Sequence, residues 1–124
     1  MTVIQSRQNA ALRHLARLGR EKKYRRSTGE MLCEGEKMLR EALASGTRVK
    51  TLLAREGWQD ALLDHAAEQG AVLYCAADAL FGLASDVETP QNVVFSCRQP
   101  QWEARDLQGK RQVLLLDGLQ DPGN

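Results

Sequence analysis

The chain has 124 residues, 43% of them hydrophobic, which is enough to bury one core. It contains no apolar run long enough to span a membrane and no N-terminal secretory signal, so we expect a cytoplasmic protein. Residues 1–50 carry 12 Lys or Arg against 5 acids and residues 51–124 carry 5 against 11, an asymmetry that favours a polyanionic partner for the N-terminal half.

The first half of the chain predicts a helix, a strand and a second helix. Ser6 and Asn9 are both suitable N-caps for a helix that reaches about Leu18 and ends at Gly19. Its apolar stripe consists of Ala11, Leu12, Leu15 and Leu18. Residues 30–34 are typical of a short strand. A second helix then begins at Gly35 and ends before Gly46.

The second half continues the alternation of strands and helices. The predicted elements are a strand over 49–54, a helix over 58–69 closed by Gly70, a strand over 71–75, a helix capped by Asp78 and a strand over 92–97. This order predicts an α/β domain over residues 1–98, with helices on both faces of a largely parallel sheet.

The last part of the chain predicts a change of domain. Residues 99–111 are polar, contain Pro100 and lack a clear period, so they are expected to form a linker. Residues 113–119 are a continuous apolar run typical of a fully buried strand, and the Pro122-Gly123 pair that follows predicts a tight turn. We therefore expect a fragment in which residues 112–124 begin a second domain.

A basic cluster lies in the N-terminal quarter. Arg13, Arg17 and Arg20 share one helix face opposite the leucines, and they are followed by Lys22, Lys23, Tyr24, Arg25 and Arg26. Glu21 is the only acid among the seven cations of residues 13–26. The cluster favours a phosphate-binding surface on which Tyr24 stacks against an unpaired base. The alternative is a solvated helix face.

The segment Cys33-Glu34-Gly35-Glu36-Lys37 carries a predicted strand into a helix. Backbone N–H groups at such a helix start can bind an anion or a base edge. Glu34 and Glu36 oppose a phosphate, but their carboxylates could accept hydrogen bonds from base amino groups or cap the helix. On these residues alone, a plain helix start is the favoured interpretation.

The remaining chemistry-bearing residues predict structural roles. The two histidines, His14 and His65, have no metal-ligand neighbour at helical spacing. The three cysteines are odd in number and lack metal or redox spacing, so they are expected to be buried free thiols. Trp58 and Trp102 are expected to pack rather than stack on a ligand. Residues 1–98 therefore offer neither a metal site nor a catalytic constellation.

Taken together, a series of short motifs resembles the substrate-binding domain of SpoU-type RNA 2′-O-ribose methyltransferases. The series comprises Ile4, Ser6, Asn9, the leucine-rich helix, Lys23-Tyr24-Arg25, Glu34-Gly35 and Thr89-Pro90-Gln91. Leu115-Leu116-Asp117 and Asp121-Pro122-Gly123-Asn124 are similar to the first motif of that family's catalytic SPOUT domain. One departure is Asn92, where the family usually has glycine.

The resemblance implies a fold, a partner and a cofactor. It implies a three-layer α/β/α domain, similar to ribosomal proteins that grip folded RNA, followed by the first strand of a knotted α/β domain. The full-length parent would bind S-adenosylmethionine through its missing C-terminal part, methylate rRNA or tRNA and form a homodimer. Gly35, Glu36 and Lys37 become expected RNA contacts. Asn124 is the one active-site residue carried across, so the fragment alone is expected to be inactive.

Two other classes of function stay open at this point. The chain could be a stand-alone, non-enzymatic RNA-binding module of the ribosomal-protein type. It could also be a protein-interaction domain whose basic face meets an acidic partner.

Overall fold

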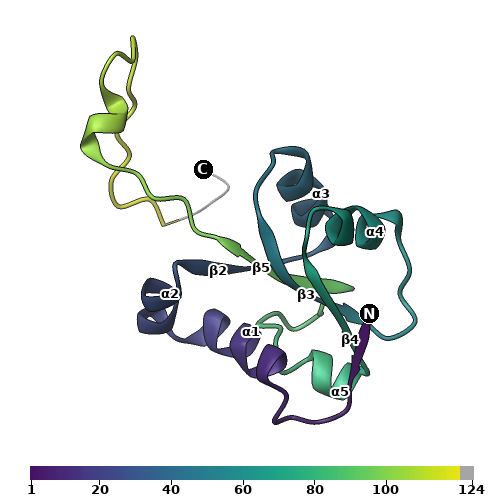
Figure 1. Ribbon diagram of the computed structural model, residues 1–124. Helices are drawn as coiled ribbons and strands as arrows, with labels where there is room; N and C mark the ends of the chain where they lie inside the picture. The colour runs from purple at the N-terminus through teal and green to yellow at the C-terminus, as the bar shows by residue number, and fades with distance from the viewer. Residues whose placement is uncertain (121–124) are drawn as a thin grey trace.

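The computed structural model describes residues 1–120, which form a five-stranded sheet with helices on both faces (Figure 1). The strands lie in the order β1 (Thr2–Ile4), β4 (Val72–Ala76), β3 (Val49–Arg55), β5 (Val93–Arg98) and β2 (Glu30–Glu34). β1, β4 and β3 pair in parallel, whereas β5 is antiparallel to both β3 and β2. The sheet is therefore mixed rather than largely parallel, because β5 enters between β3 and β2 in the reverse direction.

The helices form two outer layers, as predicted (Figure 1). Helices α1 (Ala10–Arg20), α2 (Lys22–Thr28) and α5 (Asp78–Phe81) lie on one face, and α3 (Glu36–Ala44) and α4 (Ala61–Glu68) lie on the other. Strand alternation supplies both cores. Phe95 of β5 packs in the cluster that contains Leu39 of α3, whereas its neighbour Val94 packs in the cluster that contains Leu15 of α1.

The N-terminal helical region agrees with its prediction in its cap and differs from it in two ways. Of the two predicted caps, Asn9 is the one that caps α1, since its side chain accepts hydrogen bonds from the backbone N–H groups of Ala11 and Leu12. α1 passes through Gly19 to Arg20. A second helix, α2, follows without a predicted counterpart, because its seven residues include no buried one and so carry no apolar stripe.

The caps of the later helices also differ from the prediction. Asp60 caps α4, so that helix begins at residue 61 rather than 58, and Trp58 packs against the core as expected. Asp78 lies inside α5, and Ala77 occupies the cap position. The Asp78 carboxylate instead pairs with the Arg55 guanidinium at 2.7 Å.

The chain beyond β5 runs away from the sheet (Figure 1). The expected linker contains a short 3-10 helix, Ala104–Leu107, whose start is closed by reciprocal hydrogen bonds between Glu103 and Asp106. Residues 113–119 form no strand, and Leu115 is 88% exposed, because no neighbouring strand covers them or takes up their backbone hydrogen bonds. The Asp121-Pro122-Gly123-Asn124 motif, with Asn124, lies outside the described residues.

Three side-chain predictions are corrected by the structure. All three cysteines are free thiols, but only Cys97 is buried, whereas Cys33 and Cys75 are half-buried. Trp102 does not pack: it is 81% exposed, since it lies on the segment that leaves the sheet.

Within residues 1–120, the helices are all too short or too polar to cross a membrane.

Candidate nucleic-acid interface

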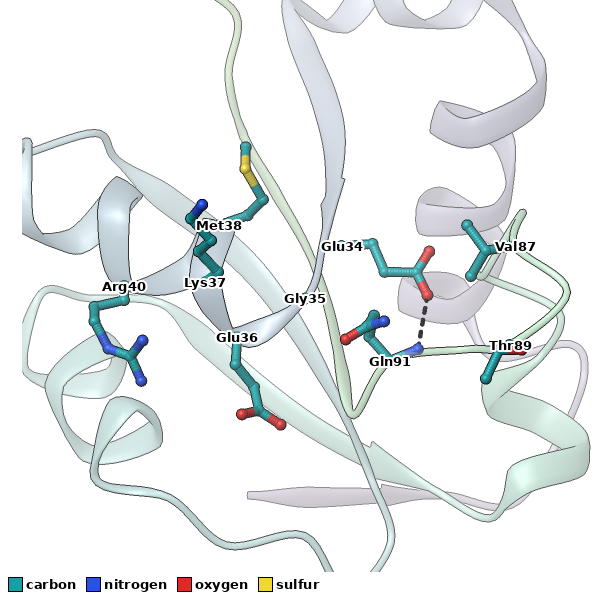
Figure 2. Close-up of a pocket in the computed structure, with 9 residues that line it drawn as sticks. All are labelled: Glu34, Gly35, Glu36, Lys37, Met38, Arg40, Val87, Thr89 and Gln91. Atoms are coloured by element: carbon teal, nitrogen blue, oxygen red, sulfur yellow. Dashed lines mark hydrogen bonds between the residues drawn. The ribbon is translucent and has the colours of Figure 1, made fainter. Parts of the chain in front are cut away.

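A hollow of about 650 Å³, lined by both polar and apolar side chains, lies where β2 passes into α3 (Figure 2). One wall is the turn itself, from Glu34 to Met38 with Arg40, and the other is the loop that precedes β5. That loop contributes Val87, Thr89 and Gln91. The hollow therefore joins the predicted Gly35, Glu36 and Lys37 to loop residues that were not predicted as site residues.

Gly35 fixes the shape of the turn. Its φ of 100° and ψ of 152° lie in a region that is essentially restricted to glycine. Its N–H donates to the Val93 carbonyl at 2.9 Å, which ties the turn to β5. Gly35 is buried, whereas Lys37 is exposed on the first turn of α3. Gly35 thus shapes the hollow, and Lys37 and Arg40 supply its cations.

The Glu34 and Glu36 carboxylates hold the facing loop in place. Glu34 Oε1 accepts from the Ser85 hydroxyl at 2.7 Å and from the Gln91 backbone N–H at 3.1 Å (Figure 2). Glu36 Oε1 accepts from the Asn92 side-chain amide at 2.7 Å. Asn92 itself needs no positive φ, since the positive φ values among the described residues all belong to glycine. The two carboxylates therefore hold the walls of the hollow together, and Asn92 is one of their hydrogen-bond donors.

The predicted basic cluster is largely exposed on α1 and α2. Arg13, Arg17 and Arg20 are exposed, whereas Leu12, Leu15 and Leu18 on the opposite face of α1 are buried. Lys22, Lys23 and Arg26 are exposed on α2. The ion pairs found within residues 1–120 involve none of Arg13, Lys22, Lys23 and Arg26. These four cations therefore present uncompensated charge to the solvent.

The other members of the cluster are engaged within the protein. Arg17 pairs with Glu21 at 2.9 Å, and its guanidinium carbon lies 3.9 Å from the centre of the Tyr24 ring. Arg25 donates to the Leu18 carbonyl at 2.8 Å and so caps the end of α1. Because Arg17 covers one face of the Tyr24 ring, that face is closed to an unpaired base.

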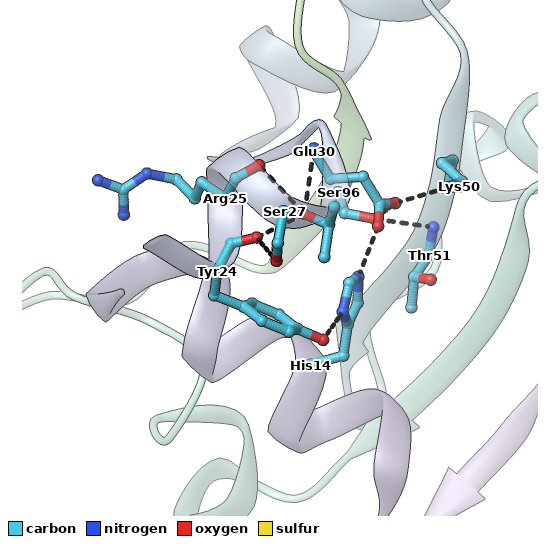
Figure 3. A network of polar contacts seen from close by, with 9 residues as sticks. His14, Tyr24, Arg25, Ser27, Glu30, Lys50, Thr51 and Ser96 are labelled. Carbon is cyan, nitrogen blue, oxygen red and sulfur yellow. Dashed lines mark hydrogen bonds and ion pairs between the residues drawn. The ribbon is translucent and has the colours of Figure 1, made fainter. Parts of the chain in front are cut away.

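A polar network anchors this helical region to the sheet (Figure 3). The His14 ring lies between Tyr24 and Glu30. His14 Nδ1 is 2.8 Å from Tyr24 Oη, and His14 Nε2 is 3.2 Å from Glu30 Oε2. Glu30 is only 6% exposed, and its Oε1 lies 3.2 Å from Lys50 Nζ and accepts from the Ser96 hydroxyl at 3.3 Å. His14 thus has a structural partner across the fold that helical spacing alone could not reveal.

The turn and the basic helices border a second hollow. This hollow, of about 410 Å³, is lined by Arg25 of α2, Leu18 and Gly19 of α1, the strand β2 from Met31 to Glu34, and Asp86. Glu34 belongs to both hollows. Arg25 of the predicted basic cluster and Glu34 beside the predicted turn residues therefore border the same hollow along β2.

Loop residues 87–91 are the site residues that sequence reasoning missed. The polar sequence Thr89-Pro90-Gln91 is typical of a turn, but it does not show which element that turn faces. The loop faces the turn because β5 pairs with β2, with Glu34 opposite Val94. This long-range pairing places Gln91 beside Gly35, where an added Cβ atom would lie 3.5 Å from its side chain.

The chain is similar to known proteins in sequence and in fold. Residues 9–94 match the model of the MRM3-like substrate binding domain family. The whole chain is 33% identical to the 23S rRNA (guanosine(2553)-2′-O)-methyltransferase RlmP of Bacillus subtilis, but covers 47% of that protein. It thus spans about half the length of this curated relative.

Two solved structures share the fold. An AdoMet-bound rRNA methyltransferase from Sinorhizobium meliloti matches with a TM-score of 0.74 and 23% identity, over 85% of this chain and 39% of that one. The SpoU methyltransferase AviRb from Streptomyces viridochromogenes, in complex with AdoMet, matches with a TM-score of 0.63 and 20% identity, over 81% of this chain and 37% of that one. At these identities the likeness concerns the fold alone.

Proposed function

The chain belongs to the MRM3-like substrate binding domain family, and from this premise we propose that it is the RNA-recognition domain of a ribose 2′-O-methyltransferase acting on rRNA or tRNA. The observation that carries the proposal is the uncompensated charge of Arg13, Lys22, Lys23 and Arg26 on α1 and α2, two helices that also border the hollow beside Glu34 through Leu18, Gly19 and Arg25. Cations of this kind neutralise phosphates, and a polar hollow can take an unstacked base edge.

The proposed layout assigns each part of the chain a role. Residues 1–98 grip structured RNA, residues 99–111 form a linker, and residues 112–124 begin the catalytic domain. Similarity to RlmP along the whole chain supports this layout, since the match extends past β5. The parent is proposed to be a cytoplasmic homodimer.

The proposed cofactor is S-adenosylmethionine, which the two neighbouring structures contain. When bound, it supplies the electrophilic methyl group for a ribose 2′-hydroxyl. No residue among 1–120 is assigned to the cofactor, because the proposal places S-adenosylmethionine in the catalytic domain that residues 112–124 begin. In this proposal the chain's own residues bind and orient the RNA.

The direct test is RNA binding by a variant that lacks cations of α2. Lys22→Ala/Lys23→Ala is expected to weaken binding of a labelled RNA hairpin and to lower the slope of log affinity against log salt by about 1 to 2. Lys110→Ala/Arg111→Ala removes the same charge from the C-terminal segment and is the matched control. Wild-type binding that does not change with salt, or equal slopes for both variants, would refute the proposal.

An enzyme parent is distinguished from a stand-alone module by a second experiment. The complete protein encoded by the gene is incubated with bulk RNA and methyl-labelled S-adenosylmethionine. Alkaline cleavage of RNA needs a free 2′-hydroxyl, so a 2′-O-methylated nucleotide stays joined to its 3′ neighbour. Label recovered in alkali-resistant dinucleotides therefore identifies a 2′-O-methyl group. A stop codon directly after Asn124 would instead favour the module.

A further inference from the structure

A second group of cations lies at the end of the β2–β5 pair opposite the Gly35 turn. Arg98 ends β5, and Arg48 immediately precedes β3. The Arg98 N–H donates to the Arg48 carbonyl at 3.4 Å, and the Gln99 N–H donates to the Gly29 carbonyl at 2.8 Å. These hydrogen bonds place Arg48 and Arg98 beside the end of α2, where Arg26 lies.

Three adjoining hollows cover this end of the sheet. Two of them, of about 510 and 220 Å³, are both lined by Arg48 and Arg98. The third, of about 440 Å³, is lined by Arg26 and Trp102, and it shares Gln99, Pro100 and Gln101 with the first. The hollows therefore form one track from the start of β3 to the segment that leaves the sheet.

The track is positively charged. Arg26, Arg48 and Arg98 are exposed and take part in none of the ion pairs found within residues 1–120. The nearby acids are already matched: Glu30 is buried against Lys50 and His14, and Glu103 pairs with Arg105 at 2.8 Å. Three guanidinium groups are thus available to one anionic ligand.

Trp102 supplies an aromatic face at the end of this track. At 81% exposure its indole ring is open to a ligand, and it borders the same hollow as Arg26. Arginines bind phosphate oxygens through paired N–H groups, and an exposed aromatic ring stacks on any unpaired base. This combination fits single-stranded RNA better than an acidic peptide, which has no bases to stack.

We propose that Arg26, Arg48, Arg98 and Trp102 form a track for a single-stranded segment of the substrate RNA. The inference rests on the proposed function and extends it, because the track lies the length of β2 away from the hollow at Gly35. Five residues of strand span about 17 Å. One RNA would therefore contact the protein at both ends of β2, with its single strand ending against Trp102.

The test compares a labelled RNA hairpin with the same hairpin carrying a single-stranded 3′ extension of about ten nucleotides. Arg48→Ala/Arg98→Ala should weaken binding of the extended RNA on the order of tenfold and lower its salt slope by about 1 to 2. Trp102→Ala should also weaken binding of the extended RNA about tenfold, whereas Trp102→Phe should keep most of it. Neither effect is expected with the hairpin alone.

The control is Arg7→Ala, which removes one exposed cation from the connection between β1 and α1, outside the residues that line the track. Thermal unfolding of each variant establishes that it is folded. If the wild type fails to bind either RNA, the proposed function fails as well. If Lys22→Ala/Lys23→Ala weakens binding but Arg48→Ala/Arg98→Ala behaves like Arg7→Ala, only the track is refuted. Equal losses for the extended RNA and for poly-glutamate, with no effect of Trp102→Ala, would also overturn it.

Discussion

At the scale of single residues, the thiol of Cys33 has an unusual environment. Its sulfur on β2 lies 3.8 Å from the sulfur of Cys97 on β5. Hydrogen bonding from the Cys97 thiol stabilises the Cys33 thiolate and lowers the pKa of Cys33 to about 7. The same contact, together with burial, raises the pKa of Cys97. Cys33 is half-buried and borders the hollow beside Arg25, so reagents can reach it.

We predict that alkylation of Cys33 has its pH midpoint near its pKa of about 7. The rate should rise with pH through this midpoint, because only the thiolate reacts. In Cys97→Ala the donor is lost, so the midpoint should move upward toward the ordinary cysteine value of about 8.5. Peptide mass spectrometry after iodoacetamide pulses measures Cys33 separately from Cys75. Cys75→Ser is the control and should leave the pH midpoint of Cys33 alkylation unchanged. The same midpoint in Cys97→Ala as in the wild type would disprove the thiol–thiolate contact.

The exposure of single residues could be predicted from the sequence, but their contacts with other elements could not. The exposed cations of α1 were predictable, because a helix separates Arg13 from Leu12 and Leu15 by its own geometry. The role of Tyr24 was not, because Arg17 reaches its ring across the break between two helices. Pairing partners in different elements depend on the tertiary fold, which local spacing does not encode.

At the scale of elements, α2 depends on its attachments to neighbouring elements. It is a helix of seven residues, shorter than the length at which an isolated helix is stable in water. The Arg25 guanidinium ties it to the end of α1, and the Tyr24 hydroxyl ties it to His14 and through His14 to Glu30. The longer elements were predictable from their apolar period, whereas α2 has no buried face to give one.

We predict that Glu30→Ala lowers the free energy of unfolding by about 2 kcal/mol. The substitution leaves the Ser96 hydroxyl and the Lys50 ammonium without their shared acceptor, and it releases His14 from the sheet. Chemical denaturation followed by circular dichroism gives the value. Glu41→Ala removes an exposed carboxylate from α3 and should leave the stability close to wild type. A Glu30 variant as stable as the Glu41 variant would show that the network contributes little.

At the scale of the whole molecule, the folded domain and the chain beyond it contrast sharply. The sheet buries Val93, Phe95 and Cys97 of β5 completely, whereas Leu114 and Leu115 are 80% and 88% exposed. Both segments are predominantly apolar, so the sequence predicts a strand for each. Of these two segments, β5 alone has neighbouring strands, and it has one on each side. An apolar segment that is predicted as a strand therefore forms one only where partner strands can pair with it.

We predict that residues 113–119 become a protected strand in the complete parent protein. In the 124-residue chain their backbone amides should exchange with deuterium at rates close to those of an unfolded peptide, whereas the amides of β5 should be strongly protected. In the parent, neighbouring strands of the proposed catalytic domain would take up the hydrogen bonds of residues 113–119 and cover their leucines. Hydrogen exchange measured by mass spectrometry on both proteins makes the comparison, with β5 as the internal reference. Fast exchange of residues 113–119 in a parent whose β5 stays protected would contradict the proposed start of a second domain.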